Sequence, residues 1–413
     1  MSSSAQTIAF IPPRYGKEIV GGAEAVIAEA AHGLAMRGYN VEVLTTCAKD
    51  HYTWANEYPA GVEQDGKVTV RRFPVELDTP GIEREAIGGK ILGGQVVPIE
   101  EQQRWANDSL RCSSLWHYVS QNGHNYRSFI FAPYMFWTTY AVSQIFPRKS
   151  IVMPCMHDEP EAYLDIFQPV INGAGGIWFL TEPEAELAGR IFDIPSRNSI
   201  VGAAVDIPES YNPESFIKKF SIKTPYLYYA GRREWGKGWQ DLVEAFGQII
   251  SENPRCNLSL VTSGVGDIEC APHIRQRIID VGFLSEEDRN NAMAGALAYV
   301  QPSARESFSR TVLEAWLAGT PVIANGMSEV VKWHVQRSQA GFCYNNIAEM
   351  VESILLLTQQ SGAAAKLAEP GRKYVLDNYQ WSQVLDRMEA SLEQWMPLLK
   401  LMPVSQTAGV ANV

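Results

Sequence analysis

Short runs of apolar residues alternate along the chain with longer segments in which apolar residues recur every three or four positions. The first run, residues 8–11, is closed by Pro12 and Pro13, and a second run lies at residues 41–44. Between them a helix-like segment ends at Gly38, and its regularly spaced apolar positions are Val26, Ile27, Ala30, Ala31 and Leu34. Continuous short apolar runs are typical of strands buried on both faces, so this segment predicts a strand–helix–strand unit of a parallel sheet.

The same pattern recurs in two series. Further strands of the first series are predicted at residues 129–131, 151–153 and 177–180. Residues 206–224 are rich in Pro, Ser, Asn and Lys, which is typical of a linker between domains. Strands of the second series are predicted at residues 226–229, 258–261, 298–300 and 322–324. Two α/β halves joined in this way leave a cleft, where the carboxyl ends of parallel strands favour ligand binding.

Three helical segments complete this outline. One is predicted over residues 182–192, directly after the strand at 177–180, and the last over roughly residues 382–399. A helix-like stretch from residue 100 to 121 lies in the less regular region 74–125.

The chain has 413 residues, of which 46% are hydrophobic and 20% are charged. Because a single domain usually holds ~100–200 residues, this length also favours two domains. There are 46 acidic and 35 basic residues, for a formal net charge of -11. An acidic surface repels nucleic-acid phosphates and anionic lipid heads, so we expect no nucleic-acid partner and at most peripheral membrane contact.

The six cysteines form no CxxC pair, which favours reduced, buried thiols. Cys155 lies close to His157 and Asp158, but no second ligand pair follows at a spacing typical of zinc sites. Residues 1–6 lack the features of a signal peptide, and no apolar run reaches the ~20 residues that span a bilayer. These features predict a cytoplasmic protein, at most peripheral to the inner face of the membrane.

Residues 231–238 form the turn Gly-Arg-Arg-Glu-Trp-Gly-Lys-Gly between a predicted strand and a helix. Backbone N–H groups of such a turn can approach an anion, and the helix N-terminus adds positive potential. Arg232 and Lys237 can bring two cations to that anion. The turn nearly matches a nucleotide P-loop, but Gly238 lacks the hydroxyl that binds Mg²⁺ there. The alternative is a glycine-rich turn whose charges are simply solvated.

A second motif, residues 302–315, follows the strand at 298–300 and runs into a helix. Glu306 precedes this helix and Glu314 lies within it. At 1.5 Å per residue their eight steps cover ~12 Å, which suits two hydroxyl-bearing rings separated by a diphosphate. The helix N-terminus is expected near the phosphates. Without the first motif, two glutamates on a surface helix would be the preferred interpretation.

Two weaker candidates lie in the first half of the chain. Gly21 and Gly22 form another glycine turn at a helix start, and His157 with Asp158 follows the strand at 151–153. A glycine pair alone is a weak signal, and a lone histidine is more often structural than catalytic.

The order and spacing of these motifs resemble those of glycosyltransferase family 4, a family of retaining enzymes with the GT-B fold. The resemblance covers nearly the whole chain, and its most specific parts are Gly231-Arg232, Lys237-Gly238, Pro302-Ser303, Glu306 with Glu314, and residues 319–323. It implies two Rossmann-like α/β domains with parallel sheets facing a central cleft. These are an N-terminal acceptor-side domain over 1–205, a nucleotide-sugar-binding domain over 206–380, and a helix over 381–400 that crosses back to the first domain.

The same resemblance implies roles for single residues. Arg232 and Lys237 hold the donor diphosphate, Glu314 binds the ribose hydroxyls, Glu306 reaches the donor sugar, and His157 lies over that sugar near the reacting carbon. His157, Arg232, Lys237 and Glu306 are thus the implied catalytic residues. Further donor-binding positions are Gly21, Gly22, Gly282, Phe283, Leu284, Phe308, Ser309 and Arg310. The sequence departs from the family pattern at Ser309, where glycine is usual.

These roles imply a hexosyltransferase that retains configuration. Arg232, Lys237 and helix N-termini stabilise the departing diphosphate, whose oxygen takes the acceptor proton. No Asp-x-Asp metal clamp is found, so we expect no metal and no cofactor. The donor is expected to be UDP-glucose, with GDP-mannose second, because UDP-hexoses are the commonest donors of the family. A glycan or lipid-linked acceptor, in cell-envelope or exopolysaccharide synthesis, is expected.

Two other functions fit the sequence less well. A sugar-nucleotide epimerase on this fold needs acid and base residues on both sides of the hexose, and no convincing set is found. A non-catalytic nucleotide-sugar- or polysaccharide-binding protein would be favoured if Arg232, Lys237 or Glu306 were absent, but all three are present.

Overall fold

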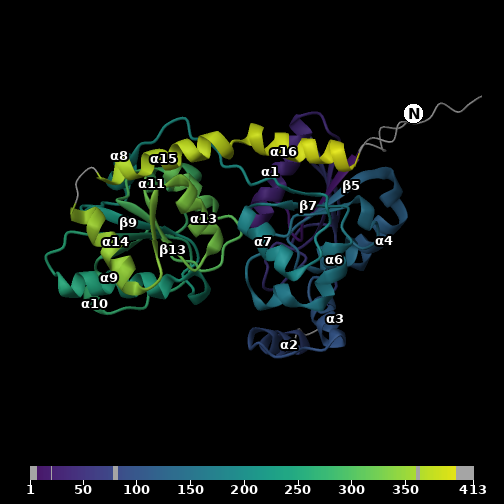
Figure 1. The fold of residues 1–413 in the computed structure, drawn as a ribbon, viewed down its shortest axis with the longest axis horizontal. Helices are drawn as coiled ribbons and strands as arrows, with labels where there is room; N and C mark the ends of the chain where they lie inside the picture. Colours follow the sequence, from purple (N-terminus) through teal and green to yellow (C-terminus); the bar gives the residue numbers. More distant parts are fainter. Residues whose placement is uncertain (1–6, 20, 78–81, 360–362, 397–413) are drawn as a thin grey trace, which may run out of the picture.

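Two largely parallel sheets, each flanked by helices, form the two halves of the protein (Figure 1). The computed structural model describes residues 7–19, 21–77, 82–359 and 363–396. The first sheet has the strand order β3-β4-β2-β1-β5-β6-β7-β8, and its only antiparallel pair within the described residues is β3 with β4. Its strands are β1 Thr7–Ile11, β2 Val41–Thr46, β3 Gly61–Asp65, β4 Val68–Phe73, β5 Tyr126–Phe131, β6 Ser150–Val152, β7 Gly176–Phe179 and β8 Asn198–Ile200.

The second sheet is parallel throughout the part that the structure describes, with the order β11-β10-β9-β12-β13-β14. Its strands are β9 Tyr226–Ala230, β10 Ser259–Ser263, β11 Ile278–Asp280, β12 Ala298–Gln301, β13 Val322–Asn325 and β14 Gly341–Tyr344. The central strands of both sheets are buried, because helices cover both faces of a parallel sheet. This architecture confirms the predicted pair of α/β domains.

Helices connect the strands of each sheet. Those of the first half are α1 Gly22–Met36, α2 Ile82–Leu92, α3 Ile99–Asn107, α4 Ser113–Asn122, α5 Trp137–Val142, α6 Gln168–Asn172 and α7 Glu182–Ile191. Those of the second half are α8 Pro213–Lys219, α9 Trp239–Glu252, α10 Pro272–Arg275, α11 Glu286–Ala294, α12 Arg310–Leu317, α13 Glu329–Ser338, α14 Ile347–Gln359, α15 Ala363–Asn378 and α16 Trp381–Trp395. Helices α2 and α3 project from the lower end of the first domain in Figure 1.

One sequence-based expectation about helices is wrong, and one segment holds a helix that was not predicted. The stretch 100–121 is two helices, α3 and α4, because the run Asn107-Asp108-Ser109 ends the first one. Short polar side chains compete for backbone groups, and the Ser109 hydroxyl donates to the Ala106 carbonyl. The segment 206–224 is not a bare linker, because it contains α8, whose first turn is capped by the Asn212 side chain accepting from the Ser215 N–H.

The C-terminal helix α16 returns to the first domain and lies along its upper edge in Figure 1, following α15 on the second domain. Trp178 of β7 donates to the Ser391 hydroxyl at 2.7 Å, and Arg127 of β5 donates to the Met396 carbonyl at 2.6 Å. Gly176 makes this contact possible, because a Cβ there would lie 2.4 Å from the Trp395 ring. The exact boundaries at residues 205/206 and 380/381 stay predictions, and residues 397–400 of the predicted helix lie outside the described residues.

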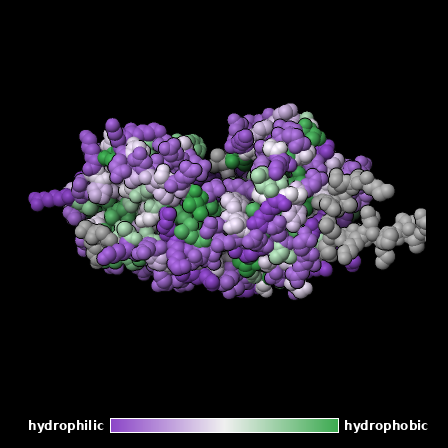
Figure 2. Space-filling view, turned by 90° about the horizontal axis from the view of Figure 1, so that it is seen from above, coloured by the Kyte–Doolittle hydropathy of each residue, from purple (hydrophilic) through white to green (hydrophobic). Residues whose placement is uncertain are grey.

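The two domains meet through polar contacts and leave a hollow between their lobes (Figure 2). Glu182 of α7 accepts from Trp333 and Arg337 of α13, both at 3.2 Å. Within the described residues, no helix is both long enough and apolar enough to cross a membrane.

Candidate active site

The turn at 231–238 leaves the carboxyl end of β9, in the middle of the second sheet, and leads into α9. Gly238 caps α9 with a left-handed φ of 68°, and a Cβ at this position would lie 2.2 Å from the Pro302 carbonyl oxygen. Glycine is therefore required here for two reasons, conformation and space. This close approach brings the first predicted motif into direct contact with the second.

The second motif leaves β12, the neighbour of β9, and enters α12. Ser309 adopts a left-handed φ of 66° immediately before the helix, which explains why glycine suits this position. A buried hydrogen bond from the Gln301 amide to the Ser309 hydroxyl, at 2.7 Å, holds the serine in place. Phe308 is buried against the rings of His334 and Tyr379. Its side chain thus belongs to the core, and only its backbone is available to a ligand.

Both predicted cations lie on the first turn, and each faces a carboxylate. Lys237 Nζ donates to Glu306 Oε1 at 2.8 Å, which joins the two motifs directly. Arg232 lies 3.2 Å from Glu234 and donates to the Tyr52 hydroxyl of the first domain, also at 3.2 Å. Arg232 therefore lies at the interdomain surface, and both cations are partly exposed.

Glu314 lies in α12, where burial leaves one of its carboxylate oxygens without a partner among the described residues. Its Oε1 accepts from Arg289 at 3.4 Å, whereas its buried Oε2 has no hydrogen bond. An unpaired buried carboxylate oxygen is costly unless a ligand hydroxyl satisfies it. The 12 Å estimate for the Glu306–Glu314 separation is wrong in its basis, because α12 begins only at Arg310 and residues 306–309 are not helical.

Arg310, the first residue of α12, contacts the first domain. Its guanidinium lies 2.9 Å from the Glu29 carboxylate of α1, and burial raises the pKa of Glu29. The predicted glycine turn lies at the start of the same helix, since Gly21 caps α1 and Gly22 begins it. The pairing partner Glu29 escaped the sequence analysis, since a helical glutamate carries no local signal of a contact 281 positions away.

The predicted donor-binding segment, Gly282 to Leu284, follows β11 at the edge of the second sheet. Gly282 is left-handed, with a φ of 64°, and the Phe283 side chain is exposed. Buried Arg233 binds the preceding Asp280 through two nitrogens, at 3.2 and 3.0 Å. Arg233 thus ties the first turn to this segment, a role that its sequence neighbourhood did not reveal.

His157 lies on a turn after β6 in the first domain, whereas these motifs belong to the second. Its Nδ1 is 3.0 Å from Glu159 Oε2, and the buried Glu159 also accepts from the Tyr134 hydroxyl at 2.8 Å. The Glu159 carboxylate thus lies beside the imidazole, whose buried Nδ1 has no hydrogen bond within the described residues. Glu159 and Tyr134 were not predicted to belong to the site.

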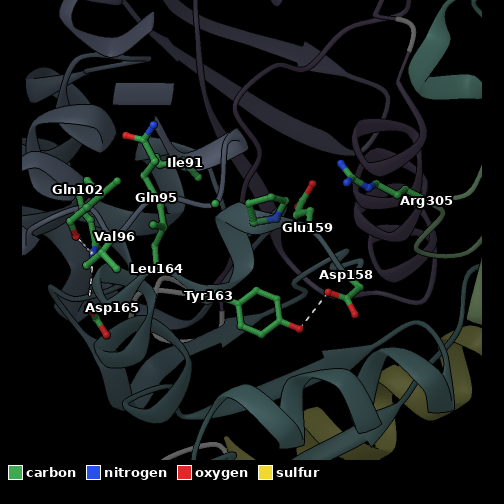
Figure 3. Close-up of a pocket in the computed structure, with 13 residues that line it drawn as sticks. Ile91, Gln95, Val96, Gln102, Asp158, Glu159, Tyr163, Leu164, Asp165 and Arg305 are labelled. Carbon is green, nitrogen blue, oxygen red and sulfur yellow. Dashed lines mark hydrogen bonds between the residues drawn. The ribbon is translucent and has the colours of Figure 1, made fainter. Parts of the chain in front are cut away.

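A cavity of about 610 Å³ opens beside this turn (Figure 3). Its wall combines apolar side chains from α2 and the following loop with polar groups of the segment 158–165, and Arg305 reaches it from the second domain. Asp158 accepts from the Tyr163 hydroxyl at 2.9 Å, and Asp165 from the Gln102 amide at 3.3 Å. The region 74–125 showed no readable motif, so the sequence analysis missed this cavity.

Comparison with known proteins agrees with this arrangement. Residues 224–360 match the family model described as Glycosyl transferases group 1. An uncharacterised glycosyltransferase of Haemophilus influenzae is 27% identical over 233 residues, which are 53% of this chain and 60% of that protein. The chain thus spans less than two thirds of the length of this curated relative.

Solved structures show the same fold over nearly the whole chain. Sucrose-phosphate synthase of Thermosynechococcus elongatus is 17% identical with a TM-score of 0.70, covering 94% of this chain and 98% of that one. Anabaena HepE, solved in complex with UDP and glucose, is 15% identical with a TM-score of 0.67, covering 94% and 100%. The predicted GT-B fold and the resemblance to a GT-B glycosyltransferase are confirmed, and these matches are consistent with a retaining family 4 type.

Proposed function

We propose that this chain, a GT-B protein whose second domain matches the glycosyl transferases group 1, transfers a hexose from a nucleotide-diphosphate sugar to a glycan or lipid-linked acceptor. The observation that carries the proposal is the contact between the two motifs at the carboxyl ends of the neighbouring strands β9 and β12. The Lys237–Glu306 pair lies there at 2.8 Å, and Glu314 presents an unpaired buried oxygen on the adjoining helix. These groups match the three parts of such a donor, namely diphosphate, sugar and ribose.

In this proposal Arg232 and Lys237 bind the diphosphate, and their present carboxylate partners give way to it or to the sugar hydroxyls. Glu314 accepts from the ribose, and the backbone at the start of α12 adds N–H donors beside the sugar phosphate. UDP-glucose is the first-choice donor and GDP-mannose the second. The bound UDP and glucose of the HepE structure support this order.

The proposed reaction is a same-face displacement that retains configuration. The bond between the anomeric carbon and the phosphate oxygen breaks, and the acceptor oxygen bonds to that carbon. The departing phosphate oxygen takes the acceptor proton. Arg232 and Lys237 stabilise the charge that develops on the diphosphate, and His157 lies over the sugar. No metal ion is assigned a step.

The cavity beside His157 is the proposed acceptor site. About 610 Å³ accommodates one or two sugar rings, and Tyr163 with Leu164 offers an apolar surface beside hydrogen-bonding carboxylates. Asp158, Glu159 and Asp165 outnumber Arg305 among its charged lining residues, so a hydroxyl-rich acceptor without a nearby phosphate fits best.

A thermal-shift screen across nucleotide sugars tests the donor half. The true donor is expected to raise the melting temperature, because it binds only the folded state, and to be hydrolysed slowly when no acceptor is present. UDP-glucose and GDP-mannose are compared with UDP, GDP and free glucose as controls. A protein that neither binds nor hydrolyses any nucleotide sugar would refute the proposal.

A further inference from the structure

The turn that carries His157 rests on a buried carboxylate from another part of the chain. Glu184 lies in the first turn of α7, and its side chain is buried with 1% of its surface exposed. Its Oε1 accepts from the Met156 N–H at 2.7 Å, and its Oε2 accepts from the Leu180 N–H at 2.6 Å. One carboxylate therefore joins the turn after β6 to the end of the neighbouring strand β7.

This arrangement differs from ordinary helix capping. Thr181 caps α7 and accepts from the Glu184 N–H at 3.2 Å, as the first half of a capping box does. In the second half of that motif the glutamate turns back to the N–H of the capping residue. Here its two oxygens accept from the Met156 and Leu180 N–H groups, so the side chain serves the turn after β6 as well as its own helix.

The backbone of the turn needs such support. Cys155, directly before Met156, adopts a left-handed φ of 53°, which costs a residue with a side chain roughly 1–2 kcal/mol. Burial raises the pKa of Glu184 to about 7, so an ionised carboxylate is costly at this position. The hydrogen bonds from the Leu180 and Met156 N–H groups, and then His157, lower this pKa, and the Cys155 thiol of the turn also faces the carboxylate.

We propose that Glu184 is the positioning residue for His157: by accepting from the Met156 N–H it holds the strained turn in the conformation that directs the imidazole over the donor sugar. The inference rests on the proposed function in its use of His157. It assigns to the segment Thr181-Glu182-Pro183-Glu184 a task beyond starting a helix.

The first test is Glu184→Gln, which preserves size but offers one acceptor oxygen to two N–H groups. Turnover is expected to fall about ten- to a hundredfold, because one buried N–H is left facing an amide NH₂. The KM for the donor is expected to stay unchanged, since Glu184 contacts none of the residues assigned to the diphosphate and the ribose. Glu186→Gln is the matched control, because Glu186 is exposed on the same helix.

A double-mutant cycle with His157→Ala separates positioning from general stabilisation. Once the imidazole is removed, Glu184→Gln is expected to have no further effect on turnover, while its effect on the melting temperature persists. Additive losses in turnover, or a loss that follows unfolding alone, would overturn the proposal. So would normal turnover of a folded Glu184→Gln variant.

The reactivity of Cys155 gives a readout that needs no activity. Its thiol is buried, with 8% of its residue surface exposed, so iodoacetamide is expected to label it slowly in the parent protein. Glu184→Gln should raise that rate at least tenfold, measured by mass spectrometry of the peptide, whereas Glu186→Gln should not. An unchanged rate overturns the role of Glu184, and absence of turnover with every donor overturns the proposed function instead.

Discussion

The two walls of the cleft differ in charge and in how their side chains are held. On the second domain, Arg232 and Lys237 lie on a turn that enters α9 through left-handed Gly238, and the adjoining motif enters α12 through left-handed Ser309. On the first domain, carboxylates dominate the cavity beside His157. The wall on the second domain suits an anionic donor, and the wall on the first domain suits a neutral, hydroxyl-rich acceptor.

The support behind the two walls differs in sequence distance. The cation-bearing turn depends on short segments that follow neighbouring strands, so most of its geometry is local. The His157 turn depends on partners farther along the chain, with Tyr134 bound to Glu159 of the turn on one side and Glu184 on the other. A site whose geometry comes from local backbone shape can be recognised from a sequence motif. A site whose geometry comes from side chains far apart in the sequence cannot.

The largest expected effect tests the wall on the second domain, which carries Arg232 and Lys237. Arg232→Ala and Lys237→Ala should each lower turnover about 10²–10³-fold, because each removes a donor to the charge that develops on the leaving diphosphate. The double mutant should lose less than the product of the single losses, since both act on one anion. Turnover and melting temperature are measured together, with exposed Lys218→Ala as control. Normal turnover in both single mutants would place the diphosphate elsewhere.

The next effect concerns binding rather than turnover. Glu314→Ala should weaken donor binding by about 1.5–3 kcal/mol, because it removes charge-assisted hydrogen bonds to the ribose. Isothermal titration calorimetry with UDP measures the change, and Glu352→Ala, an exposed glutamate of α14, serves as control. Unchanged affinity in a folded Glu314→Ala protein would contradict the ribose assignment.

A comparison of unfolding free energies isolates the backbone strain at Ser309, directly before α12. Ser309→Ala loses the hydrogen bond from Gln301 and keeps the left-handed strain, whereas Ser309→Gly loses the bond but relieves the strain. Ser309→Gly should therefore be about 1 kcal/mol more stable than Ser309→Ala in urea unfolding. Equal stability of the two variants would show that the strain is absent.

A smaller effect tests the wall on the first domain, where Asp158, Glu159 and Asp165 line the cavity beside His157. Asp165→Asn removes one exposed carboxylate from the acceptor cavity, so phosphate-bearing acceptors should gain relative to neutral ones. The ratio of transfer rates to glucose 6-phosphate and to glucose should rise a few-fold, in keeping with about 1 kcal/mol or less for an exposed charge. The rise should shrink at high salt. An unchanged ratio of the two transfer rates would show that the charge of Asp165 does not influence which acceptor is used.

No effect at all is expected from removing divalent metal. Activity should persist in excess EDTA, because two cationic side chains and helix N-termini are assigned the task of stabilising the leaving group. Assays with and without EDTA, followed by addition of Mg²⁺ or Mn²⁺, measure this. A complete loss of activity in EDTA that Mg²⁺ or Mn²⁺ restores would show that the reaction depends on a metal ion.

The sequence by itself determined the alternation of strands and helices, the two α/β halves and the two motifs of the second domain. Parallel strands are continuous apolar runs, and glycine turns at helix starts carry their chemistry within a few residues. Ser309 was already visible as a departure, although its left-handed backbone was not.

Only the tertiary structure decided which distant groups meet. It paired Lys237 with Glu306, Arg310 with Glu29, and Glu184 with the backbone of the His157 turn. It also made a cavity from α2 and the segment 158–165, neither of which has a sequence motif. The physical reason is that such contacts depend on strand order and on buried side-chain direction, and neither leaves a periodic or local trace along the chain.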